Sequence, residues 1–519
     1  MIPRILHQTW KDAAIPVAFS GYVESWKRFH PGWEFRFWTD ADLAELVATR
    51  CPEYSKLFHS YPKPIMRADL GRYLILREFG GVYADIDAEA LTSITPLLKS
   101  EMPIFAYEPR SHAALDFIRR RGFLSIVSNA VMLSPAGHPF WDHLLRLMQR
   151  CRSARDPLDA TGPIVLTAAV EQAPAPAAPQ VLPAHVFCPI DKFGVPVNRG
   201  QSALPSFAFH HWAGTWQEPF VVDASFAQPA SQLTVGDFSA AAAEANRFLS
   251  SIDRTVVDAA RPKNGCVLIA VPVRDAAESL DNLFACLLAL RYPRDQLSLA
   301  FLEGDSSDDS LDRLQAFARL HGDAFRRIDV IKRDFNTRTP AMRWTPAIQR
   351  RRRSHIAKIR NELVKQTLKD EGWVLWVDAD IIEFPDDILA TLLSTGARIV
   401  HPNAVRVRGA PSMDRNAWMI ERQISRGAMA MWIRDGLYQP PAGFERLYLS
   451  DLRYRDIVPL YGVGGTMLLV DANLHRAGLL FPENPYKFLI ETEGFGAAAH
   501  DIGVVPVGLP NVEIVHAAR

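Results

Sequence analysis

Hydrophobic residues are spaced along this chain in two ways, as short continuous runs and as positions that repeat at the period of a helix. The apolar runs predict strands at residues 4–6, 34–38, 267–271 and 297–302. Helical spacing predicts helices at residues 22–29, 40–48, 65–78, 280–290 and 354–368. Strands and helices alternate in both halves, so we expect α/β domains with mostly parallel sheets. Ligands of such sheets bind at the carboxyl ends of the strands.

The character of the chain changes between residues 223 and 264. Residues 240–243 and 246–258 predict a linker helix, and residues 261–265 predict a turn into a new domain. We therefore predict a first domain at residues 1–224, a linker at 225–262 and a second domain at 263–519. Because the two halves do not repeat each other in sequence, a fusion is favoured over a duplication.

Composition and charge describe an ordinary globular protein. Hydrophobic residues make up 48% of the chain, charged residues 22%, and the formal net charge is zero. No bulk field therefore favours nucleic acid or an anionic membrane. The basic run at residues 350–353 has no interleaved aromatic residues, so we interpret it as a solvated helix face and expect no nucleic-acid partner.

The cysteines and the apolar segments of the chain are used to predict its cellular compartment. The five cysteines are scattered without metal-binding spacing, as expected for thiols in a reducing compartment. The first ten residues lack the apolar segment of a signal peptide, and no apolar run reaches the roughly 18 residues that span a bilayer. We expect a cytoplasmic protein, whose contact with a membrane, if any, is peripheral and at the inner membrane surface.

Two aspartate pairs carry the clearest chemical signal. Asp85 and Asp87 close the predicted strand at residues 80–84, and Asp378 and Asp380 close that at 373–377. Residues i and i+2 of a strand point to the same side, so each pair directs two carboxylates at one point beyond a strand end. Mg²⁺ and Mn²⁺ favour such oxygen ligands together with substrate phosphates. A single Asp-x-Asp is more often a solvated turn, but two in the same context favour metal sites.

Other polar residues accompany these pairs, and most of them allow two interpretations. Asp69 and Arg72 are three apart on one predicted helix, which fits either a surface ion pair or a clamp for a sugar. Asp305 follows the strand predicted at 297–302, where it fits a helix cap as well as a ligand site. Arg360 follows the basic run on the same predicted helix and could approach a pyrophosphate.

The first half resembles glycosyltransferase family 32, which includes fungal α-1,6-mannosyltransferases. The resemblance rests on residues 2–10, 67–73, 80–87, 161–163 and 210–216, and covers about 1–220. It implies a GT-A fold, in which Asp85 and Asp87 hold a metal and the sugar-nucleotide. Further roles implied are donor-sugar binding for Asp69 and Arg72, metal binding for His211, and contacts to the nucleotide-sugar for His7, Trp10, Tyr83, Thr215 and Trp216.

The second half resembles glycosyltransferase family 62, the fungal mannan-polymerase subunits. Motifs in the family's order run from residue 305 to residue 516, and the resemblance covers about 265–517. It implies that Asp378 and Asp380 bind the metal with the donor diphosphate, and that His516 supplies a third protein ligand. It also places Asp305 near the nucleotide, and Glu491 and Glu493 on the acceptor side.

Both resembled families are retaining transferases. We therefore expect two GT-A-type, Rossmann-like domains in tandem and a bifunctional, metal-dependent retaining glycosyltransferase. The expected cofactors are Mn²⁺ or Mg²⁺ and a nucleotide-sugar, either GDP-mannose or a UDP-sugar, with mannose from GDP-mannose in at least one domain. The expected acceptor is a glycan or glycolipid.

Alternative functions stay open at this point. One domain could be catalytically inactive and serve as a glycan-binding scaffold. Another metal-dependent enzyme of nucleotide diphosphates is the second alternative, although the sequence contains no P-loop motif. A glycosidase is disfavoured, because two carboxylates at i and i+2 are too close to flank a scissile bond.

Overall fold

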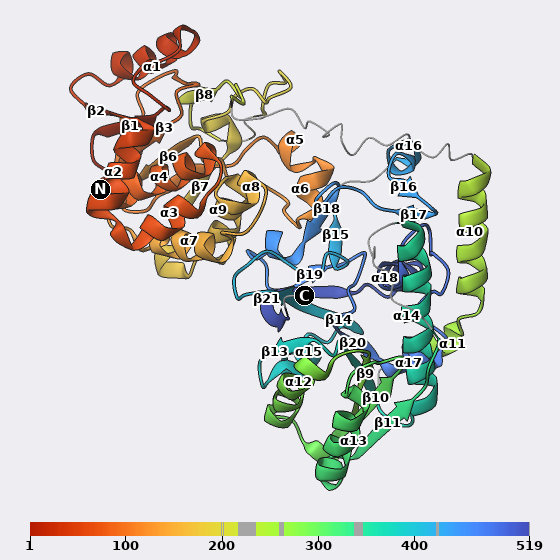
Figure 1. Cartoon of the computed structure of the whole chain (residues 1–519). Helices are drawn as coiled ribbons and strands as arrows, with labels where there is room; N and C mark the ends of the chain where they lie inside the picture. Colours follow the sequence, from red (N-terminus) through yellow and green to blue (C-terminus); the bar gives the residue numbers. More distant parts are fainter. Residues whose placement is uncertain are drawn as a thin grey trace. The chain divides into compact units, whose positions relative to one another are not determined.

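The computed structural model describes residues 1–198, 200, 202–215, 235–258, 264–336, 346–421 and 425–517. The chain packs as two compact units, Met1–Val221 with Asp451–Tyr454, and Val222–Ser450 with Arg455–Arg519 (Figure 1). Both units are α/β, with the Rossmann-like architecture expected of GT-A glycosyltransferases. None of the helices in the described ranges combines the length and apolar character needed to cross a membrane.

The first unit is built on a six-stranded sheet with a separate strand pair. The sheet has the order β2 (Glu34–Trp38), β1 (Ile5–Thr9), β3 (Gly81–Ala84), β6 (Val131–Ser134), β5 (Ile104–Ala106) and β7 (Gln180–Leu182). The separate pair is β4 (Ala88–Ala90) with β8 (Ala208–His210). The helices are α1 (Val17–Phe29), α2 (Asp40–Arg50), α3 (Ser55–Ser60), α4 (Pro64–Phe79), α5 (Arg110–Ala113), α6 (Asp116–Arg120), α7 (Pro139–Arg150), α8 (Pro157–Ala160) and α9 (Pro163–Gln172).

The second unit is built on a nine-stranded sheet. Its order is β11 (Arg327–Lys332), β10 (Leu297–Glu303), β9 (Val267–Val273), β12 (Trp373–Val377), β20 (Met467–Asp471), β14 (Ile399–Val405), β21 (Val507–His516) and β13 (Ile381–Glu383), and β19 (Val458–Pro459) also pairs with β21. Two small hairpin-like pairs are β15 (Trp418–Ile420) with β18 (Arg446–Tyr448), and β16 (Ile433–Arg434) with β17 (Leu437–Tyr438). The helices are α10 (Val235–Ser250), α11 (Arg254–Val257), α12 (Ala277–Ala289), α13 (Ser310–His321), α14 (Pro346–Thr367), α15 (Ile388–Ser394), α16 (Arg426–Ala430), α17 (Ala472–Arg476) and α18 (Glu491–Asp501).

The two units share one strand arrangement although their sequences do not repeat. The order β2-β1-β3-β6-β5-β7 matches β10-β9-β12-β20-β14-β21, and each matching pair of neighbours is parallel or antiparallel alike. In each unit a helix, α4 or α14, leads into the central strand that ends at an aspartate pair. The strands and turns around the two pairs can therefore be compared position by position.

Local sequence accounts for the elements that lead to the first pair. Helix α4 begins with Pro64, whose missing N–H costs nothing in the first turn, and ends at Gly80, which has φ 62°. Strand β3 starts one residue later and is buried along its whole length, as a central strand of apolar residues should be.

Part of the region predicted as a linker folds against the second unit. The Phe238 ring of α10 lies edge-on to Phe488, and the Phe248 ring lies edge-on to Tyr486. The Asp253 N–H donates to the Ala477 carbonyl. Residues 225–234 and 259–262 of the predicted linker lie outside the described residues, and the predicted domain boundary stays a prediction.

Candidate functional site

Two groups of two aspartates and one histidine stand at matching places in the two units. Among the described residues, Asp85, Asp87 and His210 form one group and Asp378, Asp380 and His516 the other. In each group every residue offers one ligand atom, and these atoms lie within 4.8 Å of one another. Each group combines carboxylate oxygen with imidazole nitrogen, a donor set that suits Mn²⁺ and other transition metals.

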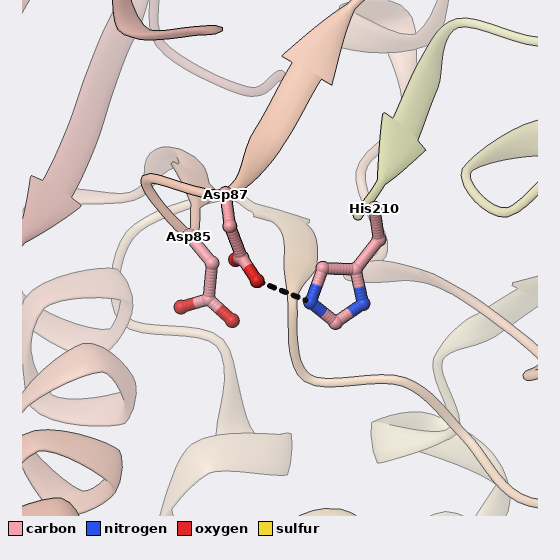
Figure 2. A group of neighbouring side chains, drawn as sticks. All are labelled: Asp85, Asp87 and His210. Atoms are coloured by element: carbon pink, nitrogen blue, oxygen red, sulfur yellow. Dashed lines mark ion pairs between the residues drawn. The ribbon is translucent and has the colours of Figure 1, made fainter. Parts of the chain in front are cut away.

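Backbone hydrogen bonds shape the first group. Strand β3 ends at Ala84, and the Asp85 N–H donates to the Ala130 carbonyl over 2.8 Å. The Ala88 N–H closes the turn onto the Asp85 carbonyl over 2.9 Å. Ala88 then pairs with His210 across the antiparallel strands β4 and β8. Figure 2 shows the side chains of Asp87 and His210 pointing toward one another, with Nε2 and Oδ2 3.4 Å apart.

His210, rather than His211, faces the aspartate pair, whereas the sequence predicts His211 as the metal ligand. The Nε2 atom of His211 lies 3.1 Å from the Glu89 carboxylate, and its ring stacks on Tyr22 at 4.0 Å. Consecutive residues of an extended segment point to opposite sides, so only one of the two histidines can face the aspartates. The sequence shows both histidines but not the pairing of β4 with β8 that selects between them.

Arg72 reaches Asp85 from the preceding helix. Its Nη1 lies 3.0 Å from Asp85 Oδ1, and its Nη2 lies 3.2 Å from Asp69 Oδ1. The Tyr83 hydroxyl donates to the same Asp85 oxygen over 2.7 Å. Asp69 and Arg72 are only 4% and 5% exposed. The residues predicted to bind the donor sugar therefore form a buried ion pair behind Asp85 in this structure.

The pKa values of the two aspartates in the first group are shifted in opposite directions. Burial raises the pKa of Asp85, although Arg72 opposes the shift. Burial acts in the same sense on Asp87, but hydrogen bonds from His210 and from the Ala213 N–H outweigh it and lower the pKa of Asp87. Desolvation alone would lower the pKa of His210, and Asp87 raises it instead. Asp87 is therefore the carboxylate that stays ionised to the lowest pH.

The second group is built by the same kinds of contact. The Asp378 N–H donates to the Thr466 carbonyl over 2.9 Å, and Ile381 pairs with His516 across β13 and β21. His516 Nε2 lies 2.9 Å from Asp380 Oδ1. Asp378 Oδ1 lies 3.1 Å from Arg360 Nη2, as Asp85 lies beside Arg72 in the first unit. The three residues predicted as metal ligands of the second domain are brought together.

The two groups also share a backbone hydrogen bond. The residue after the histidine donates its N–H to the carbonyl of the second aspartate, His211 to Asp87 and Ala517 to Asp380, each over 2.9 Å. Burial raises the pKa of Asp378, while Arg360 opposes the shift. Desolvation would lower the pKa of His516, but its contact with Asp380 raises it.

Glu491 and Glu493 are buried at the first turn of α18 and are held by different partners. Glu491 Oε1 lies 3.1 Å from Arg353 Nη1 and 3.5 Å from Arg360 Nη1. Glu493 Oε1 accepts from Arg446 over 2.8 Å and from the Trp418 indole over 2.9 Å. Glu491 thus shares Arg360 with Asp378, whereas Glu493 is held by Arg446 and Trp418. The acceptor-side role that the resemblance implies for both glutamates stays a prediction.

The remaining predicted residues of the first unit are dispersed. The buried His7 ring lies between the Gly80 carbonyl, 2.9 Å from Nε2, and the Trp38 indole, 3.2 Å from Nδ1. Trp10 packs edge-on to Phe19. Thr215 is exposed in a turn, and Trp216 lies outside the described residues. Tyr83, His7 and Trp10 thus have internal partners, and their predicted contacts with a nucleotide-sugar stay predictions.

In the second unit, Asp305 organises its own loop. Its backbone has φ 59°, and its Oδ1 accepts from the N–H groups of Phe335 and Asn336 over 3.1 and 2.9 Å. These bonds close the strand ends of β10 and β11 onto one another. Arg360 is directed at Asp378, so a contact with a pyrophosphate would have to come from its other N–H groups.

A glycine-rich loop, residues 462–466, borders the second pair, and the sequence analysis gave it no role. Its Gly465 carbonyl accepts from Arg360 Nη2 over 3.3 Å, and the Thr466 hydroxyl donates to Asp414 over 2.9 Å. A Cβ on Gly465 would clash with the Arg360 guanidinium, and one on Gly464 with the Asp414 carboxylate. The run of glycines was the available signal, because such runs mark places where other groups approach the backbone closely.

Two known families match separate parts of the chain. Residues 249–485 match the Anp1 family, and residues 16–104 match the family described as a glycosyltransferase sugar-binding region containing a DXD motif. The mannan polymerase complex subunit mnn9 of Schizosaccharomyces pombe is 31% identical over 271 residues, which cover 48% of this chain and 79% of the relative.

Other relatives are matched over less of their length. Inositol phosphoceramide mannosyltransferase 3 of Schizosaccharomyces pombe is 37% identical over 149 residues, which cover 29% of this chain and 38% of the relative. A solved structure, the mannosyltransferase PcManGT of Pyrobaculum calidifontis, has 14% identity and a TM-score of 0.30 over 55% of this chain and 68% of that chain, a likeness too low to support an argument. The chain is therefore a glycosyltransferase that belongs through residues 249–485 to the Anp1 family, and that carries a DXD sugar-binding region at residues 16–104.

Proposed function

We propose that this chain is a bifunctional, metal-dependent retaining glycosyltransferase, in which each unit transfers one sugar from a nucleotide-sugar. The donor of at least one unit is GDP-mannose, because relatives of both units are named as mannosyltransferases or mannan polymerase subunits. The observation that carries the proposal is the repeated group of two aspartates and a histidine at the end of the central strand in each unit. A scaffold would not need two complete groups.

The residues of the second group fit a divalent cation. His516 Nδ1 lies 2.9 Å from the Ala517 carbonyl and so carries a proton, which leaves the lone pair of the neutral ring on Nε2. That lone pair faces an oxygen of Asp380 at 2.9 Å. Two acceptors at this distance repel one another unless the ring is protonated or a cation lies between them. A divalent cation satisfies both and neutralises the paired carboxylates.

A cation held by these residues would act as a Lewis acid on the donor diphosphate. The chain's own residues orient the ligand atoms, since Arg72 and Arg360 hold the first aspartate of each pair. Asp87 stays ionised to a lower pH than Asp85, because His210 and the Ala213 N–H stabilise its charge. Roles of Asp69, Arg72, Glu491 and Glu493 in contact with sugar or acceptor remain predictions.

The acceptor is proposed from the names of the relatives. Mannan polymerase subunits indicate a mannose-containing glycan for the second unit, and inositol phosphoceramide mannosyltransferases indicate a glycolipid for the first. The names of the second unit's relatives also suggest assembly with other subunits. The predicted cytoplasmic location and peripheral contact with a membrane stay predictions.

The experiment is a screen of the full chain against GDP-mannose, GDP-fucose and the common UDP-sugars, with Mn²⁺, Mg²⁺ or EDTA. We expect release of GDP from GDP-mannose that requires the cation and rises when a mannoside acceptor is added. Release of nucleotide that is insensitive to EDTA would contradict metal dependence. Failure of every donor in the presence of both cations would contradict the assignment of a glycosyl donor.

A further inference from the structure

We infer that a buried arginine–carboxylate pair holds the first aspartate of each metal-binding pair in place, and that Asp69 and Glu491 are positioning residues. This inference rests on the proposed function, since it assumes that the aspartate pairs bind a cation. It assigns to Asp69 and Glu491 a task that neither the motif resemblance nor the family comparisons describe. It also predicts a defect in cation affinity rather than in contact with sugar or acceptor.

The second unit shows the arrangement through Arg360. The side chain is 4% exposed, and its guanidinium lies between two carboxylates. Nη2 is 3.1 Å from Asp378 Oδ1, and Nη1 is 3.5 Å from Glu491 Oε1. The same Nη2 donates to the Gly465 carbonyl over 3.3 Å, and the guanidinium carbon stands 5.2 Å from the centre of the Phe481 ring. The guanidinium therefore has one defined position, and Asp378 is held by it.

Glu491 has the burial and partners of a structural counter-ion. It is 2% exposed, which leaves little surface for an acceptor sugar to contact. Its Oε1 is shared by Arg353 at 3.1 Å and Arg360 at 3.5 Å. Without this carboxylate the guanidinium groups of Arg353 and Arg360 would lose the counter-charge that they share. Arg360 would then shift, because a buried charge that loses a partner is costly.

The first unit reaches the same arrangement with different elements. Arg72 on α4 contacts Asp85 at 3.0 Å and Asp69 at 3.2 Å. Asp69 is fixed in turn by the Thr161 hydroxyl over 2.9 Å and the Asn129 amide over 3.1 Å. Both of its oxygens are therefore engaged by protein side chains.

The same arginine–carboxylate arrangement occurs in both units, although different elements supply it. Both arginines come from the helix that leads into the aspartate-bearing strand, α4 or α14. The carboxylate comes from that same helix in the first unit but from α18 in the second. Since different elements supply the same charge at the same place, the requirement lies in the position of the first aspartate.

The test measures Mn²⁺ binding by electron paramagnetic resonance, on the full chain without donor or acceptor. Glu491→Gln is made in a background in which Asp85 and Asp87 are alanine, so that only the second site binds. Asp69→Asn is made with Asp378 and Asp380 replaced by alanine. Each isosteric variant should weaken Mn²⁺ affinity by about tenfold or more, as is usual when a partner of a metal ligand is lost.

Matched controls separate this effect from the loss of any buried ion pair. Asp471→Asn in the second unit breaks a buried pair with Arg398, and Asp159→Asn in the first breaks a buried pair with Arg121. Both should leave Mn²⁺ affinity unchanged. Glu491→Asp, which keeps the charge, should restore part of the affinity that Glu491→Gln loses.

The outcomes distinguish this inference from the proposed function. Unchanged Mn²⁺ affinity in both isosteric variants, with a raised KM for donor or acceptor, would overturn the positioning role and favour substrate contact. Absence of Mn²⁺ binding by the unmodified chain would instead refute the proposed function. If Glu491→Gln does not fold, Gly465→Ala replaces it, because the added Cβ displaces Arg360 from Asp378 and should weaken Mn²⁺ binding to the same extent.

Discussion

His516 Nε2 lies 2.9 Å from Oδ1 of Asp380, although the two residues are far apart in the sequence. The contact follows from sheet pairing, since Ile381, the residue after Asp380, is opposite His516 in the antiparallel pair β13–β21. Strand β21 continues to His516 and ends at the aspartate pair, so the C-terminal end of this strand is part of the site.

Replacing His516 by alanine should raise the Mn²⁺ concentration needed for the second unit's transfer by roughly tenfold or more, because one nitrogen ligand is lost. The half-saturating Mn²⁺ concentration of each transfer is the measurement. His500→Ala, a histidine of α18 whose ring bonds the Leu460 carbonyl, is the control and should leave this concentration unchanged. Equal Mn²⁺ dependence in His516→Ala and wild type would remove His516 from the site.

In the first unit, His210→Ala and His211→Ala should behave differently. Only His210 faces Asp87, whereas His211 contacts Glu89 and Tyr22. We expect His210→Ala to weaken Mn²⁺ binding by roughly tenfold or more, and His211→Ala to change it by much less. The measurement is isothermal titration calorimetry with Mn²⁺, in a background in which Asp378 and Asp380 are alanine. A larger loss of Mn²⁺ affinity in His211→Ala would favour His211, the ligand that the sequence predicts.

The two aspartate pairs should serve separate transfers. Replacing Asp85 and Asp87 by alanine should reduce one transfer by on the order of a hundredfold or more and spare the other, because charge stabilisation at the diphosphate is lost in one unit only. Replacing Asp378 and Asp380 should do the converse. Product analysis with both acceptors present is the measurement. If either double variant, still folded, lost both transfers, the two pairs would have to share one activity.

Acid should destabilise the second unit through His475. This buried ring accepts from the Trp376 indole over 3.1 Å, and its Nδ1 bonds the Leu479 carbonyl over 2.9 Å. Burial lowers the pKa of His475 to about 4. The unfolded chain takes up a proton below about pH 6.5 while the folded ring stays neutral, so its stabilisation is complete above about 6.5 and is lost as the pH falls toward 4.

We therefore expect the advantage of wild type over His475→Gln in unfolding free energy to shrink between pH 6.5 and 4, by up to about 1.4 kcal/mol per pH unit. The measurement is the free energy of unfolding of the second unit, obtained from urea unfolding at several pH values. The comparison with a variant is needed because burial raises the pKa of other acids in the second unit, such as Glu493, which acts in the opposite direction. His321→Gln, at a partly exposed histidine, is the control. If the difference in unfolding free energy between wild type and His475→Gln stayed constant from pH 6.5 to 4, the prediction would be wrong.

Much of the fold could be predicted because its signals are local. The strand at Glu34–Trp38 and the helix ended by Gly80 follow from side-chain period and backbone preference within one segment. The Asp-x-Asp turns follow in the same way, since an apolar strand and the turn after it are adjacent in sequence. Local signals also found the α/β class, because alternating strands and helices leave few other ways to bury their apolar faces.

The choice between His210 and His211 could not be predicted, because it depends on which strand pairs with β4 and in which register. The same holds for Arg360, which the sequence directed at a pyrophosphate and the structure directs at Asp378 and Glu491. The sequence by itself determined the strands and turns that carry the two aspartate pairs, and the residue types available for a cation site. Only the tertiary structure decided which of those residues meet, because long-range strand pairing and the packing of α14 against α18 set distances that no local pattern encodes.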